Sequence, residues 1–272
     1  MTKQFFLSST AVVALMIGVP GQAQAQTPYN WTGRYVGFYA GGAWGSSNAS
    51  TLVDCADGVS DVYICSRSGF GAADAALVNA AGTGKITSSG FTGGLEGGYN
   101  WQVRNFVYGL ESDFGAFGLR GSRQVSGVIP NNGFFDSGPF IVTHSISTDW
   151  LWTLRGRVGV ALPNNILPFL TGGLAVTQFR FSSATNFAGN FGFPASSGAG
   201  SSAVMAGWTL GGGVEWAFND HWRVKAEYLY LNFGKLTTAA TIVTNPAGYS
   251  QGISTSADLT AQLVRVGFNY GF

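Results

Sequence analysis

Charged residues that recur at every second position are the side chains in this sequence best placed to act together. Successive side chains of an extended strand point to opposite faces, so charges of equal parity within one segment share a face. In each alternating segment they fall opposite the aromatic and branched apolar residues. The set comprises Glu96, Glu111, Asp113, Arg155, Arg157, Glu215, Lys225, Glu227 and Arg265.

Two kinds of chemistry fit these charged residues. Five of them are acidic and four are basic, so they could pair with one another and close a narrow interior. Alternatively, carboxylates and guanidinium groups on facing walls could line a small pore and set its ion selectivity. We favour the ion-pair network, because side chains nearly fill the interior of a small barrel.

Catalytic, cofactor and metal sites are not predicted. A hydrolase at a membrane edge would combine serine, histidine and a carboxylate, and the two histidines of the chain are His144 and His221. His144 precedes Ser145 at a suitable place, but the neighbourhood of neither histidine matches a hydrolase pattern. Residues 82–85 (GTGK) lack the hydroxyl residue that a phosphate-binding loop needs after its lysine, because Ile86 follows.

The first residues and the two cysteines indicate export. Residues 1–25 combine Lys3, a short apolar run and a small-residue cleavage site, which predicts a cleaved secretory signal peptide. An uncleaved anchor helix is the alternative, but the run is short for a span of about 20 residues. In an oxidising compartment Cys55 and Cys65 are predicted to form a disulfide. Zinc is disfavoured, since no second cysteine pair or histidine lies nearby.

Composition narrows the class of protein. Charged residues form only 10% of the chain and the net charge is +1, so there is no basic surface for nucleic acid. Glycine and aromatic residues are plentiful, as the 41 glycines and 14% aromatic content show. After the signal peptide, no stretch is long and apolar enough for a transmembrane helix.

Eight alternating segments are predicted as strands, joined by connections that are long and short in turn. The strands are expected near residues 31–46, 89–102, 106–119, 147–162, 167–181, 204–218, 222–236 and 257–272. Residues 47–88, 120–146, 182–203 and 237–256 read as four long loops, rich in Ser, Ala and Gly. The facing of residues 167–181 cannot be assigned. This order predicts an antiparallel up-and-down barrel with its long loops at one end.

The charge pattern favours a barrel in lipid over a soluble sandwich. In hydrocarbon every backbone polar group must be paired internally, which only helices and closed barrels achieve. The face opposite the aromatic residues is charged and glycine-rich, as expected for a narrow interior. Aromatic residues also cluster near both ends of the predicted strands, where membrane interfaces select them. The belt expected nearer the loop end consists of Trp44, Phe91, Trp152, Phe181, Trp208 and Tyr230. The prediction is an eight-stranded transmembrane β-barrel formed by residues 26–272 as one domain, with four long extracellular loops.

Three blocks of sequence resemble the small outer-membrane β-barrel proteins of alphaproteobacteria, which include opacity-type and haemin-binding members. The blocks are NWTGRYVGFYAGGAWG at residues 30–45, GFTGGLEGGYNWQ at 90–102 and VRVGFNYGF at 264–272. The resemblance implies location in the outer membrane of a Gram-negative cell and contact with its lipid. It also implies that Phe268, Tyr270 and Phe272 form the C-terminal signal read by the barrel-assembly machinery. The long first loop departs from the family, so functions carried by relatives' loops are not transferred.

The function expected from these observations is structural, with a contribution to envelope integrity and to contacts at the cell surface. A narrow porin for small solutes is the main alternative. A haem-binding barrel is a weaker one, in which Tyr63, His144 and Tyr249 would be ligands. A lipid-modifying barrel enzyme is weaker still, and we expect the protein not to be an enzyme.

Overall fold

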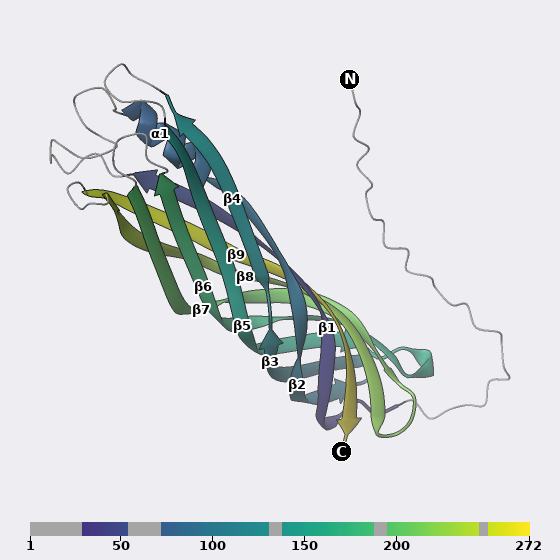
Figure 1. Ribbon diagram of the computed structural model, residues 1–272. Coiled ribbons are helices and arrows are strands. Elements are labelled where there is room, and N and C mark those ends of the chain that lie inside the picture. Colours follow the sequence, from purple (N-terminus) through teal and green to yellow (C-terminus); the bar gives the residue numbers. More distant parts are fainter. Residues whose placement is uncertain (1–28, 54–71, 131–137, 188–194, 245–249) are drawn as a thin grey trace, which may run out of the picture.

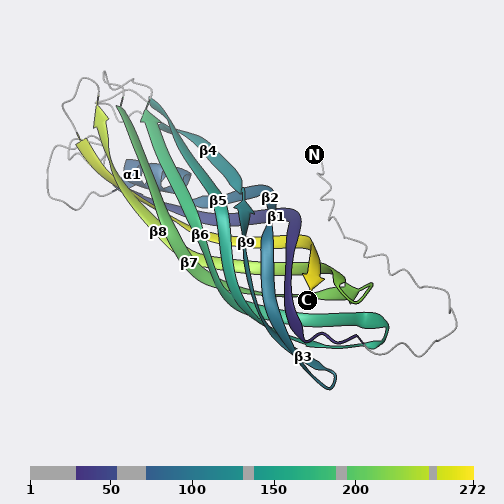
Figure 2. The same cartoon turned by 90° about the horizontal axis from the view of Figure 1, so that it is seen from below.

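The computed structural model describes residues 29–53, 72–130, 138–187, 195–244 and 250–272. In this part of the chain one antiparallel sheet closes on itself, because β1 pairs with both β2 and β9 (Figures 1 and 2). The strands are β1 (Gly33–Val53), β2 (Gly84–Val103), β3 (Phe106–Phe117), β4 (Arg120–Ile129), β5 (Gly138–Val160), β6 (Ile166–Phe187), β7 (Ala195–Ala217), β8 (Trp222–Thr244) and β9 (Ser250–Gly271). The only α-helix of the described residues is α1 (Ala72–Gly82), and a short 3-10 helix covers Pro163–Asn165.

The barrel is a ring of eight positions, as predicted, although the described residues contain nine strands. β3 and β4 occupy one position in succession, since both pair with β5 on one side and with β2 on the other. Gly118 and Leu119 separate them. The eight-stranded up-and-down barrel is therefore confirmed.

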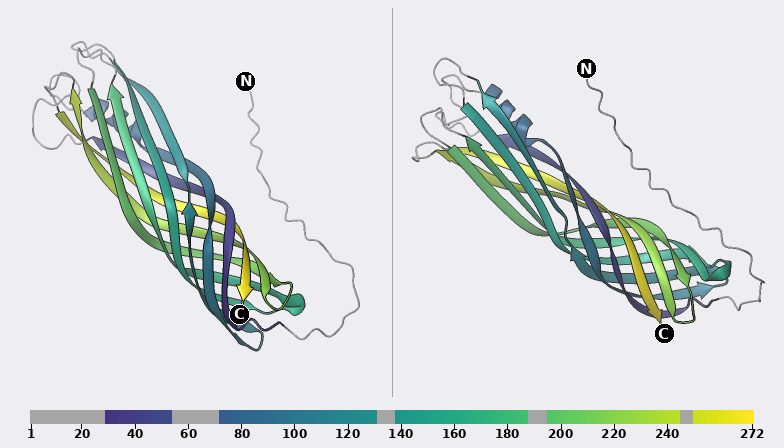
Figure 3. Two further views of the ribbon diagram at one scale, coloured as in Figure 1. Left: turned by 60° about the horizontal axis from the view of Figure 1, so that its bottom comes forward. Right: turned by 45° about the vertical axis from the view of Figure 1, so that its right-hand side comes forward.

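The strands are longer than predicted. β5 has 23 residues, whereas about 9–11 are enough to cross a bilayer. Much of what the sequence analysis assigned to long loops continues the strands instead: β1 runs on to Val53, β4 and the first part of β5 lie within 120–146, and β6 to β9 extend in the same way. These extensions form a further section of the barrel, on the side away from the short turns (Figure 3). We call this section the second storey.

The polarity of the two barrel faces reverses between the storeys. This reversal explains why the strand extensions were wrongly predicted as loops. In the storey that ends at the short turns, the outward side chains are apolar, such as Phe38, Leu95 and Leu154, and the charges lie inside. In the other storey, most outward side chains are polar, and the buried interior is mainly apolar, with His144 and several serine and threonine side chains among the apolar residues. Its main cluster includes Ile86, Phe117, Leu119, Ile146, Leu151, Phe179, Phe181, Leu229, Leu231, Phe233, Leu259 and Leu263.

Helix α1 lies at the far end of the second storey, at the end opposite the C-terminus (Figure 1). Its buried Ala75 and Val78 belong to a further apolar cluster with residues of several strands, including Phe140 and Ile253. Side chains tie α1 to the barrel: Arg123 of β4 donates through Nη1 to the Ala81 carbonyl oxygen at 2.6 Å, and the Val53 N–H of β1 donates to Asn79 Oδ1 at 2.7 Å. Within the described residues, no helix combines the length and apolar character that crossing a membrane requires.

The short-turn end is closed by the segment that precedes β1. Trp31 is buried with Val107, Leu167 and Ala217, and its backbone N–H donates to Gln102 Oε1 at 2.8 Å. The turns themselves are tight. In the turn between β5 and β6 the backbone φ is 63° at Asn164 and 59° at Asn165, a left-handed conformation that asparagine tolerates better than most residues.

Candidate functional site: the filled barrel interior

We call the part of the barrel next to the short turns, whose outward side chains are apolar, the lipid-facing storey. An ion-pair network fills its interior, and Arg155 of β5 lies at the centre of this network. Its Nη2 atom is 2.5 Å from Glu111 Oε1 and 2.8 Å from Asp113 Oδ2, both on β3. Its Nη1 atom is 2.9 Å from Glu227 Oε2 on β8. One guanidinium therefore joins strands on opposite walls of the barrel, and its side chain is fully buried.

The other predicted charges extend this network across the bore. Arg265 contacts Glu227 at 2.5 Å and Asp113 at 3.2 Å, and its guanidinium lies 4.1 Å from the centre of the Tyr39 ring. Arg157 contacts Glu215 at 2.6 Å and Glu111 at 3.5 Å. Lys225 Nζ is 2.6 Å from Glu96 and 3.0 Å from Glu111. The structure thus brings together all nine charged residues singled out from the sequence.

A tenth charge, Arg223, was missed by the sequence analysis. Its guanidinium is buried 3.9 Å from Glu215, and it donates to the Tyr29 hydroxyl at 2.9 Å. With Arg223 the network holds five acidic and five basic side chains, so it is formally neutral. The parity of Arg223 matches that of Lys225 and Glu227, and this alternation was the signal that could have identified it.

Tyrosine hydroxyls complete the network from β1. The Tyr35 hydroxyl donates to Glu111 Oε2 at 2.6 Å, and the Tyr39 hydroxyl lies 3.4 Å from Asp113 Oδ1. Thr153 donates to Asp113 Oδ2 at 2.6 Å. Buried charges are costly unless each is paired and hydrogen-bonded, and these hydroxyls add further hydrogen bonds to carboxylate oxygens that the cations also contact.

Three carboxylates offer a cluster that could hold a metal ion, but a lysine already supplies the positive charge. Oxygens of Glu96, Glu111 and Glu227 lie within 4.8 Å of one another. Lys225 Nζ lies 2.6, 3.0 and 3.6 Å from them. Arg155 and Arg265 contact Glu111 or Glu227 as well, so three cations of the protein balance the three carboxylates.

Comparison with known proteins gives the family. The family model described as outer membrane protein beta-barrel domain matches residues 11–272. The chain belongs to this family. It is 30% identical over 271 residues to the 31 kDa outer-membrane immunogenic protein of Brucella melitensis, covering 98% of this chain and 95% of the relative. It is 25% identical to the 25 kDa outer-membrane immunogenic protein of Brucella abortus, covering 93% of this chain and 85% of that protein.

Among solved structures, an outer-membrane protein is similar to this chain. The outer membrane protein OprG of Pseudomonas aeruginosa matches with a TM-score of 0.43 and 13% identity, covering 90% of this chain and 98% of that one. As a member of the outer-membrane β-barrel family, the protein is located in the outer membrane.

The lipid-facing surface of this outer-membrane barrel carries most of the predicted aromatic residues. Trp101, Phe106, Trp216 and Phe272 are exposed at the short-turn end, and Trp44, Phe91 and Trp208 lie outward nearer the second storey. Phe181 was assigned to this second belt, and that prediction is wrong. Its side chain is buried inside the second storey, because the face of β6 was not assigned from the sequence.

The remaining predicted residues fall in different places. Phe268, Tyr270 and Phe272 follow the outward face of β9 to its end, where Tyr270 packs edge-on against Phe272. His221 lies in the turn before β8 and stacks on Tyr270. His144 is buried inside the second storey instead of being solvated. Cys55, Cys65, Tyr63, Tyr249 and the signal peptide lie outside the described residues.

Proposed function

We propose that this protein is a closed, non-conducting barrel with a structural role in the outer membrane, and that its second storey makes contacts at the cell surface. What carries the proposal is the filled interior. The ion-pair network occupies the bore within the lipid-facing storey, and the apolar cluster around Phe179, Leu229 and Leu263 lies directly beyond it. Water and ions crossing the barrel would have to displace both.

The two layers resist opening for different physical reasons. Removing one partner of a buried ion pair costs about 3–5 kcal/mol, so charges are not moved aside easily. The apolar layer excludes ions, because a buried charge without a partner is strongly disfavoured there. A structural barrel needs such rigidity, whereas a porin needs a water-filled path through the polar interior.

A narrow porin is the second candidate, and one observation favours it. Acidic and basic side chains face each other inside the membrane-spanning storey, as they do in selective pores. In this alternative the network would rearrange to pass small solutes, and the apolar layer would separate as well.

Conductance across a planar bilayer distinguishes the two candidates. We expect the purified, folded protein to give no discrete current steps. Arg155→Ala and Glu111→Ala should also be silent, because the apolar layer remains when a charge is removed. A known porin inserted in the same bilayer is the positive control, and a difference in gel migration between unboiled and boiled samples would verify folding. Steps in the wild type that change with either substitution would establish the porin instead.

The structural role can be tested in cells. We expect deletion of the gene to increase the sensitivity of the cells to detergents and large hydrophobic antibiotics, and the wild-type gene to restore resistance. A deletion strain with an unchanged envelope would contradict the structural role.

The proposal includes no catalytic role. His144 is the histidine best placed for catalysis by sequence. Its Nε2 atom instead lies 2.9 Å from the Gly82 carbonyl oxygen beneath α1, away from the lipid face. Liposome assays of lipid hydrolysis, with His144→Ala as a control, test this part. Lipid hydrolysis that is lost in the variant would contradict it.

A further inference from the structure

A row of outward side chains crosses four neighbouring strands just above the lipid-facing surface. In the register of the sheet, Arg120 of β4 lies beside Ser147 of β5, Ser147 beside Arg180 of β6, and Arg180 beside Ser202 of β7. We call these four residues the arginine row. The next row toward the cell exterior is Ser122, Ser145, Ser182 and Gly200, so small polar side chains extend the same surface.

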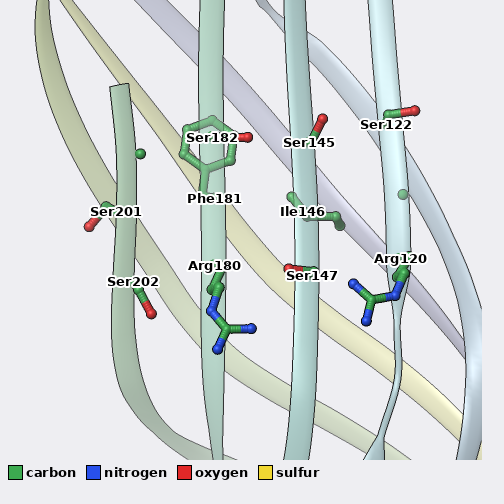
Figure 4. Close-up of a pocket in the computed structure, with 12 residues that line it drawn as sticks. Arg120, Ser122, Ser145, Ile146, Ser147, Arg180, Phe181, Ser182, Ser201 and Ser202 are labelled. Carbon is green, nitrogen blue, oxygen red and sulfur yellow. The ribbon is translucent and has the colours of Figure 1, made fainter. Parts of the chain in front are cut away.

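These rows line a shallow hollow of about 690 Å³ on the outer wall of the barrel. Figure 4 shows Arg120 and Arg180 on the strands to either side of Ser147, with serine hydroxyls beside and above them. Two strands in a sheet that are separated by a third lie about 10 Å apart. That spacing and the small residue between them leave room for a group of the size of a phosphate or a sugar between the two guanidinium groups.

The position of the hollow relative to lipid identifies the kind of ligand. Four to six residues toward the short-turn end, β3, β5, β6 and β7 carry four apolar side chains outward in adjacent positions, namely Phe114, Trp152, Val176 and Ala206. The arginine row therefore begins where the apolar surface ends. In an outer-membrane protein this is the level of the headgroups of the outer leaflet, where amphipathic and cationic side chains meet lipid.

The two arginines differ in what already neutralises them. Arg180 pairs with Asp149, and both side chains are more than one-third exposed. Exposed pairs contribute only about 0–1 kcal/mol, so a stronger anion can replace Asp149. Among the described residues Arg120 has no ion-pair partner within 4 Å.

We propose that the arginine row binds the phosphorylated sugar headgroup of an outer-leaflet glycolipid. The planar guanidinium groups would hold a phosphate through paired N–H donors, a geometry for which arginine is better suited than lysine. The serine rows would contact sugar hydroxyls, and the acyl chains would lie along the surface near Trp152 and Val176. This inference depends on the location in the outer membrane and not on whether the barrel conducts.

Binding of purified lipid probes to the folded protein in detergent tests the proposal. The probes are a glycolipid with a phosphorylated glucosamine headgroup, the same glycolipid after removal of its phosphates, and inorganic phosphate. Retention is measured by native mass spectrometry, and affinity by the fluorescence of the nearby tryptophans. We expect the phosphorylated glycolipid to bind at least ten times more tightly than the dephosphorylated one, and phosphate alone to compete only weakly.

Matched variants separate the arginine row from general surface charge. Arg120→Ala with Arg180→Ala should weaken binding of the phosphorylated glycolipid at least tenfold. Lys85→Ala with Lys235→Ala removes two outward cations elsewhere and should leave it unchanged. Asp149→Asn should strengthen binding, because Arg180 loses its competing anion. Ser147→Trp fills the hollow without changing charge and should weaken binding, which provides a second test if the double arginine variant does not fold.

Three results would overturn the proposal. The first is equal affinity of the wild type and the folded double arginine variant. The second is equal binding of the phosphorylated and dephosphorylated glycolipids. The third is complete displacement of the lipid by inorganic phosphate at comparable concentration, which would assign the row to free phosphate.

Discussion

Arg155 is the residue on which most of the interior charge depends. It contacts three carboxylates on two other strands, and its side chain is excluded from solvent. In Arg155→Ala those carboxylates lose a shared cation inside the barrel. We expect the free energy of unfolding to fall by about 3–5 kcal/mol, as for other buried ion pairs that lose one partner. Urea unfolding of the protein in lipid vesicles would measure it.

Arg180→Ala is the matched control for this prediction. The variant also removes an arginine that pairs with a carboxylate, but the pair is exposed on the outer wall. Its loss should change the stability by no more than about 1 kcal/mol. Equal destabilisation by the two substitutions would mean that burial of the network is not what stabilises the barrel.

At the residue level, parity predicted most of the interior correctly. The charged side chains on β2, β3, β5, β7, β8 and β9 point inward where alternation placed them. Which charged side chains form ion pairs could not be predicted. The contact of Arg155 with Glu227, for example, joins residues 72 positions apart. Which charges meet depends on the stagger of the closed barrel, and a single sequence does not contain that information.

At the level of elements, α1 is held over a buried histidine. His144 Nε2 is 2.9 Å from the carbonyl oxygen of Gly82, the last residue of α1, and 3.4 Å from the Thr51 hydroxyl. His144 lies outside the lipid-facing storey. Burial lowers the pKa of its imidazole below the usual value, the nearby Arg123 charge acts in the same direction, and the Gly82 contact opposes them. The neutral form is therefore the one that favours the docked helix.

Acid should loosen this helix. Since the pKa of His144 is lower in the folded protein than the value of about 6.5 in an unfolded chain, its contribution is complete above pH 6.5. It is lost as the pH falls through the folded pKa. We expect the backbone amides of α1 to exchange hydrogen faster at pH 5 than at pH 7.5, after correction for intrinsic rates. Burial raises the pKa of Asp74 in the first turn, which acts in the opposite sense at lower pH.

His144→Gln supplies the comparison, because the amide can still contact the Gly82 carbonyl and does not titrate. In this variant the corrected exchange of α1 should be similar at the two pH values. If α1 in the variant loosened with acid as much as in the wild type, His144 would not be the group responsible.

The elements that the sequence analysis missed share one property, which is low contrast between their two faces. In β7 the residues Ser196–Ser202 are all Ser, Gly or Ala, so alternation has almost no amplitude there. Helix α1 is rich in alanine and lies in a stretch of similar composition. The apolar cluster that it shares with Phe140 and Ile253 forms only after the barrel closes. Strands and a helix of this kind are specified by tertiary packing rather than by local pattern.

For the whole molecule, the decisive feature is that one continuous sheet contacts lipid along one part of its length and water along the other. Near the short turns the outer wall contacts lipid and the charges pair inside, whereas in the second storey the outer wall is mainly polar and the interior is mainly apolar. Lipid disfavours charged groups and water disfavours apolar groups, so each storey buries the kind of side chain that its surroundings disfavour. The strands can be continuous because backbone pairing is the same in both storeys.

This arrangement predicts that one substitution has different effects at two places on the outward face of β5. Leu154 is outward and exposed in the lipid-facing storey, and Leu154→Arg should destabilise the protein in vesicles by about 2–4 kcal/mol, as arginine does near the middle of a bilayer. Thr143 also points outward, in the second storey and beyond the register shift between Thr148 and Leu151, and Thr143→Arg should be nearly neutral, within about 0.5 kcal/mol. Urea unfolding in vesicles measures both variants. If Thr143→Arg were as costly as Leu154→Arg, lipid would cover the second storey as well, and the level assigned to the arginine row would be wrong.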